Sequence, residues 1–197
     1  MNQEPGNARR MALVLLLLFV APLAAAFWLY YGSSWRPART TNHGALIQPV
    51  VPLPDVALTA LREGVDAPGH PLRQRWSLVV VATGPDGCDA DCRGTLVYAR
   101  QTWLSLGKLS DRVRRVLLAA PPCCEADLLL RTHAGLAALD ASSPAGSALA
   151  ALFPAPHARS IFVVDPLGNL MMRYDVRQDP KGLRVDLQKL LELSHIG

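Results

Sequence analysis

The chain has 197 residues, half of them hydrophobic, and a formal net charge of +4. This length accommodates one domain of ordinary size together with an additional segment. The charges are spread along the chain without a basic stripe or interleaved aromatic residues, so the sequence predicts no nucleic-acid partner. It also contains no G-x-S-x-G elbow, H-E-x-x-H motif or phosphate-binding glycine loop, which argues against a hydrolase.

The first expected element is a transmembrane anchor over residues 11–31, preceded by a short cytoplasmic tail of residues 1–10. This stretch of 21 residues contains no charge. At 1.5 Å per residue it is long enough to cross the roughly 30 Å hydrocarbon core of a bilayer. Aromatic side chains such as Trp28 and Tyr30 crowd its far end and suit a membrane interface. The alternative is a cleaved signal peptide, with Ala24 and Ala26 as an A-x-A-like site.

The orientation of the anchor is decided by chain layout more than by charge. Arg9 and Arg10 on one side are balanced by Arg36 and Arg39 on the other. A ten-residue tail is too short to form a domain, and everything that can fold follows the span. We therefore expect a single-pass inner-membrane protein whose C-terminal part lies in the periplasm, if the source is a Gram-negative bacterium.

Residues 32–75 are expected to form a proline-rich tether, because they contain six prolines among short apolar pieces. The apolar residues of 55–61 allow an extra strand against the folded part, although they follow no clear period. The folded domain is then expected over residues 76–197.

The domain is predicted to alternate strands and helices. The apolar run that starts at Trp76 is rich in β-branched residues and is bounded by glycine and proline, which favours a buried strand. The predicted elements are a strand at 77–83, a helix at 95–106, a strand at 113–118, helices at 125–139 and 146–152, strands at 160–165 and 170–174, and a helix from about 180. The order β-α-β-α-β-β-α predicts an α/β, thioredoxin-like mixed sheet flanked by helices.

Two cysteines, Cys88 and Cys92, lie where the first strand of the domain gives way to the first helix. Unpaired N–H groups and the helix dipole favour thiolates at such a junction. Of the three pairings that four cysteines allow, the local spacing favours Cys88 with Cys92. Cys123 and Cys124 could form a second redox or metal site, but we expect small buried residues without chemistry.

Three acids, Asp86, Asp89 and Asp91, surround this cysteine pair. They raise the pKa of nearby thiols and so oppose the helix dipole, while Arg93 partly offsets them. Two interpretations stand equally: the acids cap the helix and solvate the turn, or they attract a metal ion or a basic partner.

Two thiolates with one imidazole suit soft Cu(I). The third ligand would then be one of the five histidines, of which His157 lies between Pro156 and the strand at 160–165, in a loop at the edge of the sheet.

The Cys88-x-x-x-Cys92 pair, followed by His157 nine residues before the proline of Asp165-Pro166-Leu167-Gly168, resembles the Sco/SenC family. The resemblance covers about 76–194 and implies a membrane-anchored thioredoxin-like domain that binds copper through Cys88, Cys92 and His157. It also implies a role in assembling the dinuclear copper centre of cytochrome c oxidase, with the copper-bearing subunit or another assembly factor as partner. The family usually has proline after the second cysteine and often after the first, where this chain has Arg93 and Asp89. The chain would therefore be a divergent member.

Two alternatives remain beside this Sco-like function. In the first, Cys88 and Cys92 are the catalytic residues of a thiol-disulfide oxidoreductase that binds no metal. In the second, a non-catalytic thioredoxin-like domain acts as an assembly scaffold, with a disulfide kept for stability.

Overall fold

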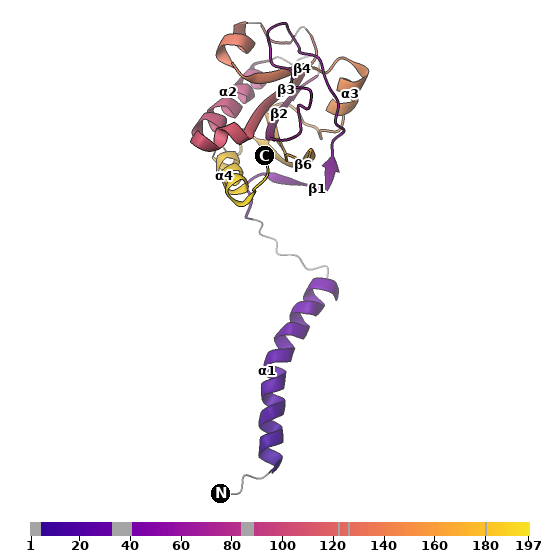
Figure 1. Ribbon diagram of the computed structural model, residues 1–197, viewed down its shortest axis with the longest axis vertical. Coiled ribbons are helices and arrows are strands. Elements are labelled where there is room, and N and C mark those ends of the chain that lie inside the picture. Colours follow the sequence, from indigo (N-terminus) through magenta and orange to yellow (C-terminus); the bar gives the residue numbers. More distant parts are fainter. Residues whose placement is uncertain (1–4, 33–40, 84–88, 122, 126, 180) are drawn as a thin grey trace. The chain divides into compact units, whose positions relative to one another are not determined.

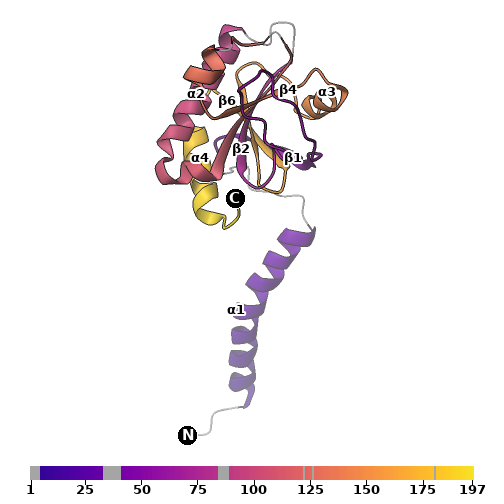
Figure 2. The same cartoon turned by 45° about the horizontal axis from the view of Figure 1, so that its top comes forward.

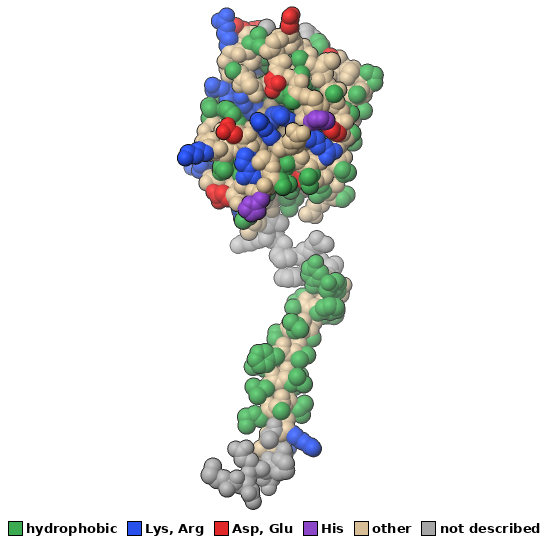
Figure 3. Space-filling model, viewed as in Figure 1, with side chains coloured by type: hydrophobic (Ala, Val, Ile, Leu, Met, Phe, Trp, Pro, Cys, Tyr) green, Lys and Arg blue, Asp and Glu red, His purple; other side chains and the backbone are tan. Residues whose placement is uncertain are grey.

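The computed structural model describes residues 5–32, 41–83, 89–121, 123–125, 127–179 and 181–197. It separates into two units, residues 1–40 and residues 41–197 (Figure 1). The first unit holds one helix, α1 (Pro5–Gly32). From Arg9 to Gly32 this helix is long and apolar enough to cross a membrane. Hydrophobic side chains cover it along its length (Figure 3), which fits the expected anchor.

The second unit is built on a six-stranded mixed sheet with the strand order β1-β6-β5-β2-β3-β4. The strands are β1 (Ala45–Pro52), β2 (Trp76–Ala82), β3 (Val113–Ala119), β4 (Leu136–Asp140), β5 (Ser160–Val164) and β6 (Asn169–Asp175). Strands β2, β3 and β4 are parallel, whereas β5, β6 and β1 join by antiparallel pairing. The mixed thioredoxin-like sheet predicted from the element order is confirmed.

Helices cover both faces of this sheet, with α2 (Ala90–Ser105) and α4 (Gly182–Leu193) on one face and α3 (Pro144–Ala150) on the other (Figure 2). Successive side chains of a strand point to opposite faces. Accordingly Val80 of β2 joins the buried cluster beneath α2 and α4, and Val81 joins the cluster beneath α3. Burial on both faces explains the uninterrupted apolar sequence of β2.

One predicted helix is wrong in large part. The described residues of 125–139 include a short π-helical turn, η2 (Leu128–Thr132), followed by strand β4. Gly135 adopts a φ of +74°, which glycine tolerates and which turns the chain into the strand. Parallel pairing with β3 then buries the Leu136–Leu139 segment almost completely, and this tertiary burial overrides the local helical pattern.

The segment assigned to a tether joins the folded unit from Thr41 onward. Strand β1 pairs antiparallel with β6, so the added strand lies at 45–52 and not at 55–61. Within 55–61, Ala60 makes an isolated bridge to Leu139. Four leucines that follow β1 are buried, namely Leu53, Leu58, Leu61 and Leu72.

Candidate functional site

The carboxyl ends of the parallel strands β2, β3 and β4 meet at one edge of the sheet, where open α/β sheets bind their ligands. The segments that leave this edge carry most of the predicted site residues. Residues 84–88 lie outside the described part of the chain, so the position of Cys88 is not among the structural findings.

Cys92 lies in the first turn of α2, which follows β2. The Asp89 side chain caps this helix, with Oδ1 accepting a hydrogen bond from the backbone N–H of Cys92 at 2.7 Å. Cys92 is buried and is a free thiol, so it takes no part in the local disulfide that the spacing favours.

Two further cysteines, Cys123 and Cys124, share the buried cluster of Cys92, although no local sequence pattern groups them with it. The Sγ atoms of Cys123 and Cys124 are 3.1 Å apart, and both residues belong to the same buried cluster as Cys92. All three residues are buried, as expected for Cys123 and Cys124. One sequence signal could have placed them together: Cys88 and Cys92 follow β2, Cys123 and Cys124 follow β3, and these strands are adjacent and parallel.

The environment shifts the pKa values of the Cys92 and Cys124 thiols in opposite directions. The hydrogen bond with Cys124 raises the pKa of Cys92, and burial and the Asp89 carboxylate act in the same direction. The same hydrogen bond lowers the pKa of Cys124 against its burial, with help from the charges of Arg62 and Arg93. Of these two thiols, Cys124 therefore loses its proton more readily than Cys92. The neighbouring Cys124, burial and the Asp89 carboxylate together raise the pKa of Cys92, in the direction opposite to the one expected at a helix start.

The acids near the cysteine turn act in the folded structure as cap and ion-pair partners. Asp89 is the N-cap of α2, and the Asp91 carboxylate pairs with Arg177 at 2.8 Å and Arg159 at 3.3 Å. Asp86 lies outside the described residues. For Asp89 and Asp91 the capping and pairing role is thus the better interpretation, since their charges are already engaged within the domain.

His157 lies in the connection between α3 and β5. Its Nε2 atom bonds to the Phe153 carbonyl oxygen at 2.9 Å, and its ring lies edge-on to Phe162 with 6.3 Å between centroids. With Nε2–H as the donor, Nδ1 of a neutral imidazole keeps its lone pair. Both phenylalanines belong to the cluster beneath α3, whereas Cys92 belongs to the cluster on the opposite face of the sheet.

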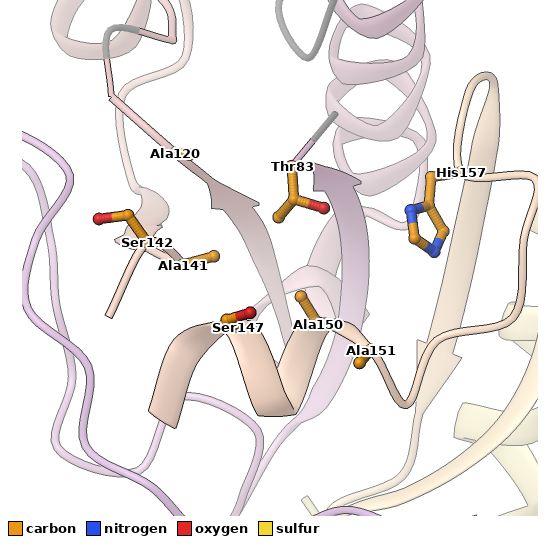
Figure 4. Close-up of a pocket in the computed structure, with 8 residues that line it drawn as sticks. All are labelled: Thr83, Ala120, Ala141, Ser142, Ser147, Ala150, Ala151 and His157. Atoms are coloured by element: carbon orange, nitrogen blue, oxygen red, sulfur yellow. The ribbon is translucent and has the colours of Figure 1, made fainter. Parts of the chain in front are cut away.

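A pocket of about 350 Å³ opens beside His157 at the carboxyl edge of the sheet. Figure 4 shows the imidazole and Thr83, the residue that follows β2, among the side chains that line this pocket. Thr83, Ala120, Ala141, Ser142, Ser147, Ala150, Ala151 and His157 line this pocket. Among the described residues, no group of three or more His, Cys, Asp and Glu side chains is placed to hold a metal ion. Because Cys88 is not among them, the predicted set of Cys88, Cys92 and His157 stays a prediction.

The six-stranded mixed sheet, with a cysteine in the first turn of the helix that follows β2, defines a thioredoxin-like protein. Residues 76–194 match the family model described as "Transmembrane-like, thioredoxin-like, C-terminal domain". This match spans more than half of the sequence, and the chain belongs to that family. No curated protein sequence matches the chain.

Solved structures of Sco proteins share the fold. The apo Sco1 protein from Thermus thermophilus aligns with a TM-score of 0.54 and 22% identity, over 78% of this chain and 99% of that one. Copper-bound ScoI from Bradyrhizobium japonicum aligns with a TM-score of 0.53 and 17% identity, over 71% of this chain and 99% of that one. Copper-bound yeast Sco1 aligns with a TM-score of 0.54 and 12% identity, over 79% of this chain and 96% of that one. The resemblance to the Sco/SenC family is thus confirmed at the level of the fold.

Proposed function

We propose that the protein is a membrane-anchored, Sco-like factor that assists cytochrome c oxidase assembly, by delivering copper or by reducing the cysteines of the oxidase copper site. The observation that carries the proposal is the fold, which is shared with two Sco structures that hold copper. The apolar helix α1 supports a single-pass membrane anchor, and the proposal places it in the inner membrane with the domain in the periplasm. The partner would be the copper-bearing oxidase subunit or another assembly factor.

Copper is the cargo in this proposal, and Cys88, Cys92 and His157 are its ligands. Thiolates and an imidazole suit Cu(I), and the Nδ1 lone pair of His157 is compatible with that role. Cys92 must lose its proton to bind, so copper binding releases protons at this thiol. Transfer would proceed by ligand exchange with a thiolate-rich site on the partner.

A second candidate is a thiol-disulfide oxidoreductase that binds no metal, and the cysteine cluster favours it. Cys92, Cys123 and Cys124 share one buried cluster, and the pKa of Cys124 is lowered while that of Cys92 is raised. A thiolate is the species that attacks a disulfide. In this function the partner's disulfide would be reduced without any role for His157.

An anaerobic Cu(I) titration of the reduced full-length chain in detergent, against a competing chelator, separates these functions. The proposal expects one tightly bound equivalent, which Cys88→Ser and Cys92→Ser each abolish. His157→Ala should weaken binding at least about 10-fold, because even the loss of an outer-shell partner has an effect of that size. His195→Ala is the matched control, since it removes an exposed imidazole at the end of the chain, and it should leave the affinity unchanged.

Two outcomes would count against copper handling. Absence of binding above the chelator would reject it, and turnover of a disulfide substrate by the same preparation would then support the oxidoreductase. Equal affinity of the wild type and His157→Ala would reject His157 as a ligand while leaving the cysteines in place.

A further inference from the structure

The pocket beside His157 is large enough to hold a ligand of its own. Its volume of about 350 Å³ lies at the lower end of the roughly 300–1,000 Å³ that ligand sites occupy. Thr83 follows β2, Ala120 follows β3 and Ala141 follows β4, so the pocket forms where the parallel strands end. This volume admits one small molecule or one large side chain.

The most buried residues of the pocket are apolar. Ala141 and Ala150, which line it, are only 3% and 4% exposed, and their methyl groups offer a small contact surface. The described residues that line the pocket include no Asp, Glu, Lys or Arg. A charged ligand would lose its hydration here without meeting an opposite charge, which is costly. The lining therefore selects an uncharged group that has an apolar surface.

Polar side chains surround these alanines. Figure 4 shows Thr83, Ser147 and His157 around a common space, on segments that follow β2, form α3 and precede β5. Within the part of the chain that the structure describes, the hydroxyl groups of Thr83 and Ser147 make no hydrogen bond. The Ser142 hydroxyl, by contrast, already donates to Asp140 Oδ1 at 2.6 Å. Two hydroxyl groups are thus left to bond a ligand.

An aromatic ring that carries a hydroxyl group matches this lining. The ring is apolar and can contact the alanine methyl groups, whereas the hydroxyl can donate to one of the two available hydroxyl groups and accept from the other. Tyrosine is the protein side chain with this combination, and its O–H group usually finds a partner when it is buried. Tyrosine is also enriched among the side chains that anchor protein interfaces in pockets.

We propose that this pocket receives a tyrosine side chain of the partner protein. His157 lines the pocket and is one of the copper ligands of the proposed function, so a partner that exchanges copper with this chain has to approach the same place. A tyrosine held in the pocket would fix the orientation of the partner beside His157. The choice of a protein partner rests on the proposed function, whereas the affinity of the pocket for a phenol ring does not.

The test titrates N-acetyl-tyrosinamide, which presents the side chain as a protein does, into the nitrogen-15-labelled full-length chain in detergent without copper. Chemical shifts are followed by NMR, and the free probe is corrected for uptake by protein-free micelles. We expect saturable shifts at the lining residues with a Kd on the order of 1 mM, as for a ligand of this size. Ala151→Leu, which fills the pocket, should weaken binding at least about 10-fold. Ala148→Leu is the matched control, since Ala148 is also exposed but is not one of the lining residues.

A second probe, N-acetyl-phenylalaninamide, tests the role of the hydroxyl group. It should bind the wild type at least about 5-fold more weakly, because it leaves the pocket hydroxyls without their partner. Thr83→Val/Ser147→Ala should bring the two probes to equal affinity. Ser142→Ala is the matched control and should keep the preference for tyrosine, since the Ser142 hydroxyl is already engaged by Asp140. Equal affinity of the two probes for the wild type would overturn the proposal.

Two further outcomes would also overturn it. Shifts that do not saturate, or that saturate equally in the wild type and Ala151→Leu, would show that the pocket is not the binding site. Free tyrosine binding as tightly as the blocked amide would point to a small metabolite in place of a protein partner. Because the titration contains no copper, a chain that binds the tyrosine probe but no copper loses the proposed function and keeps the pocket, and the reverse result rejects the pocket alone.

Discussion

Asp186 shows how one buried carboxylate holds the start of the folded unit in place. Its oxygens accept hydrogen bonds from the Tyr174 hydroxyl at 2.8 Å, the backbone N–H groups of His43 and Gly44 at 2.7 and 3.2 Å, and the His43 Nδ1 at 2.9 Å. Burial raises the pKa of Asp186, but these hydrogen bonds outweigh it and the net pKa is lowered. The carboxylate therefore joins the chain before β1 to β6 and α4.

The His43–Asp186 pair predicts a pH-dependent contribution to stability. The hydrogen bond to Asp186 raises the pKa of His43 above its ordinary value of 6.5. A group whose folded-state pKa is raised stabilises the fold fully below its unfolded pKa, and that stabilisation is lost as pH rises through the folded value. The melting temperature should therefore fall as the pH rises from about 6 to 8, and His43→Gln should flatten this part of the profile.

The measurement is thermal unfolding of the full-length chain in detergent, followed by circular dichroism between pH 5 and pH 8. His195→Gln, which changes an exposed histidine after α4, should keep the wild-type profile. If the melting temperature changes equally with pH in the wild type and in His43→Gln, the His43–Asp186 pair adds no pH dependence to stability. At lower pH the sign reverses for Asp186, whose lowered pKa makes its contribution disappear as pH falls through the folded value.

At the scale of elements, two helical glycines have opposite surroundings. A Cβ at Gly146 in α3 would lie 2.7 Å from both the Cα of Ala141 and the carbonyl oxygen of Asp140. A Cβ at Gly94 in α2 would meet no atom within 4 Å. Gly146 thus permits α3 to pack against the backbone that follows β4, whereas Gly94 has no packing role and only loosens its helix.

Alanine at these two positions should shift stability in opposite directions. Gly94→Ala should stabilise the protein by about 0.5–1 kcal/mol, because alanine restricts the unfolded chain and favours helix. Gly146→Ala should destabilise it by about 1–3 kcal/mol, because rigid backbone atoms have to move. Each variant is the control for the other in chemical denaturation. A Gly146→Ala midpoint at or above that of the wild type would show that α3 shifts freely on the sheet.

At the scale of the whole molecule, the family match and the folded unit begin at different residues. The family model starts at residue 76, whereas the compact unit starts at Thr41. The preceding segment supplies β1 and four buried leucines, at positions 53, 58, 61 and 72. At about 1.5–3 kcal/mol for each buried leucine, these four contribute on the order of 6–12 kcal/mol. That equals the entire stability of many domains.

Truncated chains should therefore show whether the stable folded unit begins at Thr41 or at Trp76. A chain that begins at Thr41 is expected to unfold cooperatively on heating, whereas one that begins at Trp76 is expected to show no cooperative transition and to bind a hydrophobic dye. Circular dichroism melting of both purified chains is the measurement. Equal melting temperatures would show that residues 41–75 add little, and would return them to the role of a tether.

Local chemistry in the sequence was enough to predict the anchor helix, the strands β2, β3, β5 and β6, and the helices α2 and α4, because their apolar periods are long and clear. It also singled out Cys92 at a strand-to-helix junction, since cysteine, cap and helix start lie within a few residues. The sequence wrongly predicted a helix where β4 lies, since β4 forms by pairing with β3, which is distant from it in the sequence. The tertiary structure alone decided that β1 joins β6 and that Cys124 shares the buried cluster of Cys92, because both depend on which strands become neighbours and not on any local pattern.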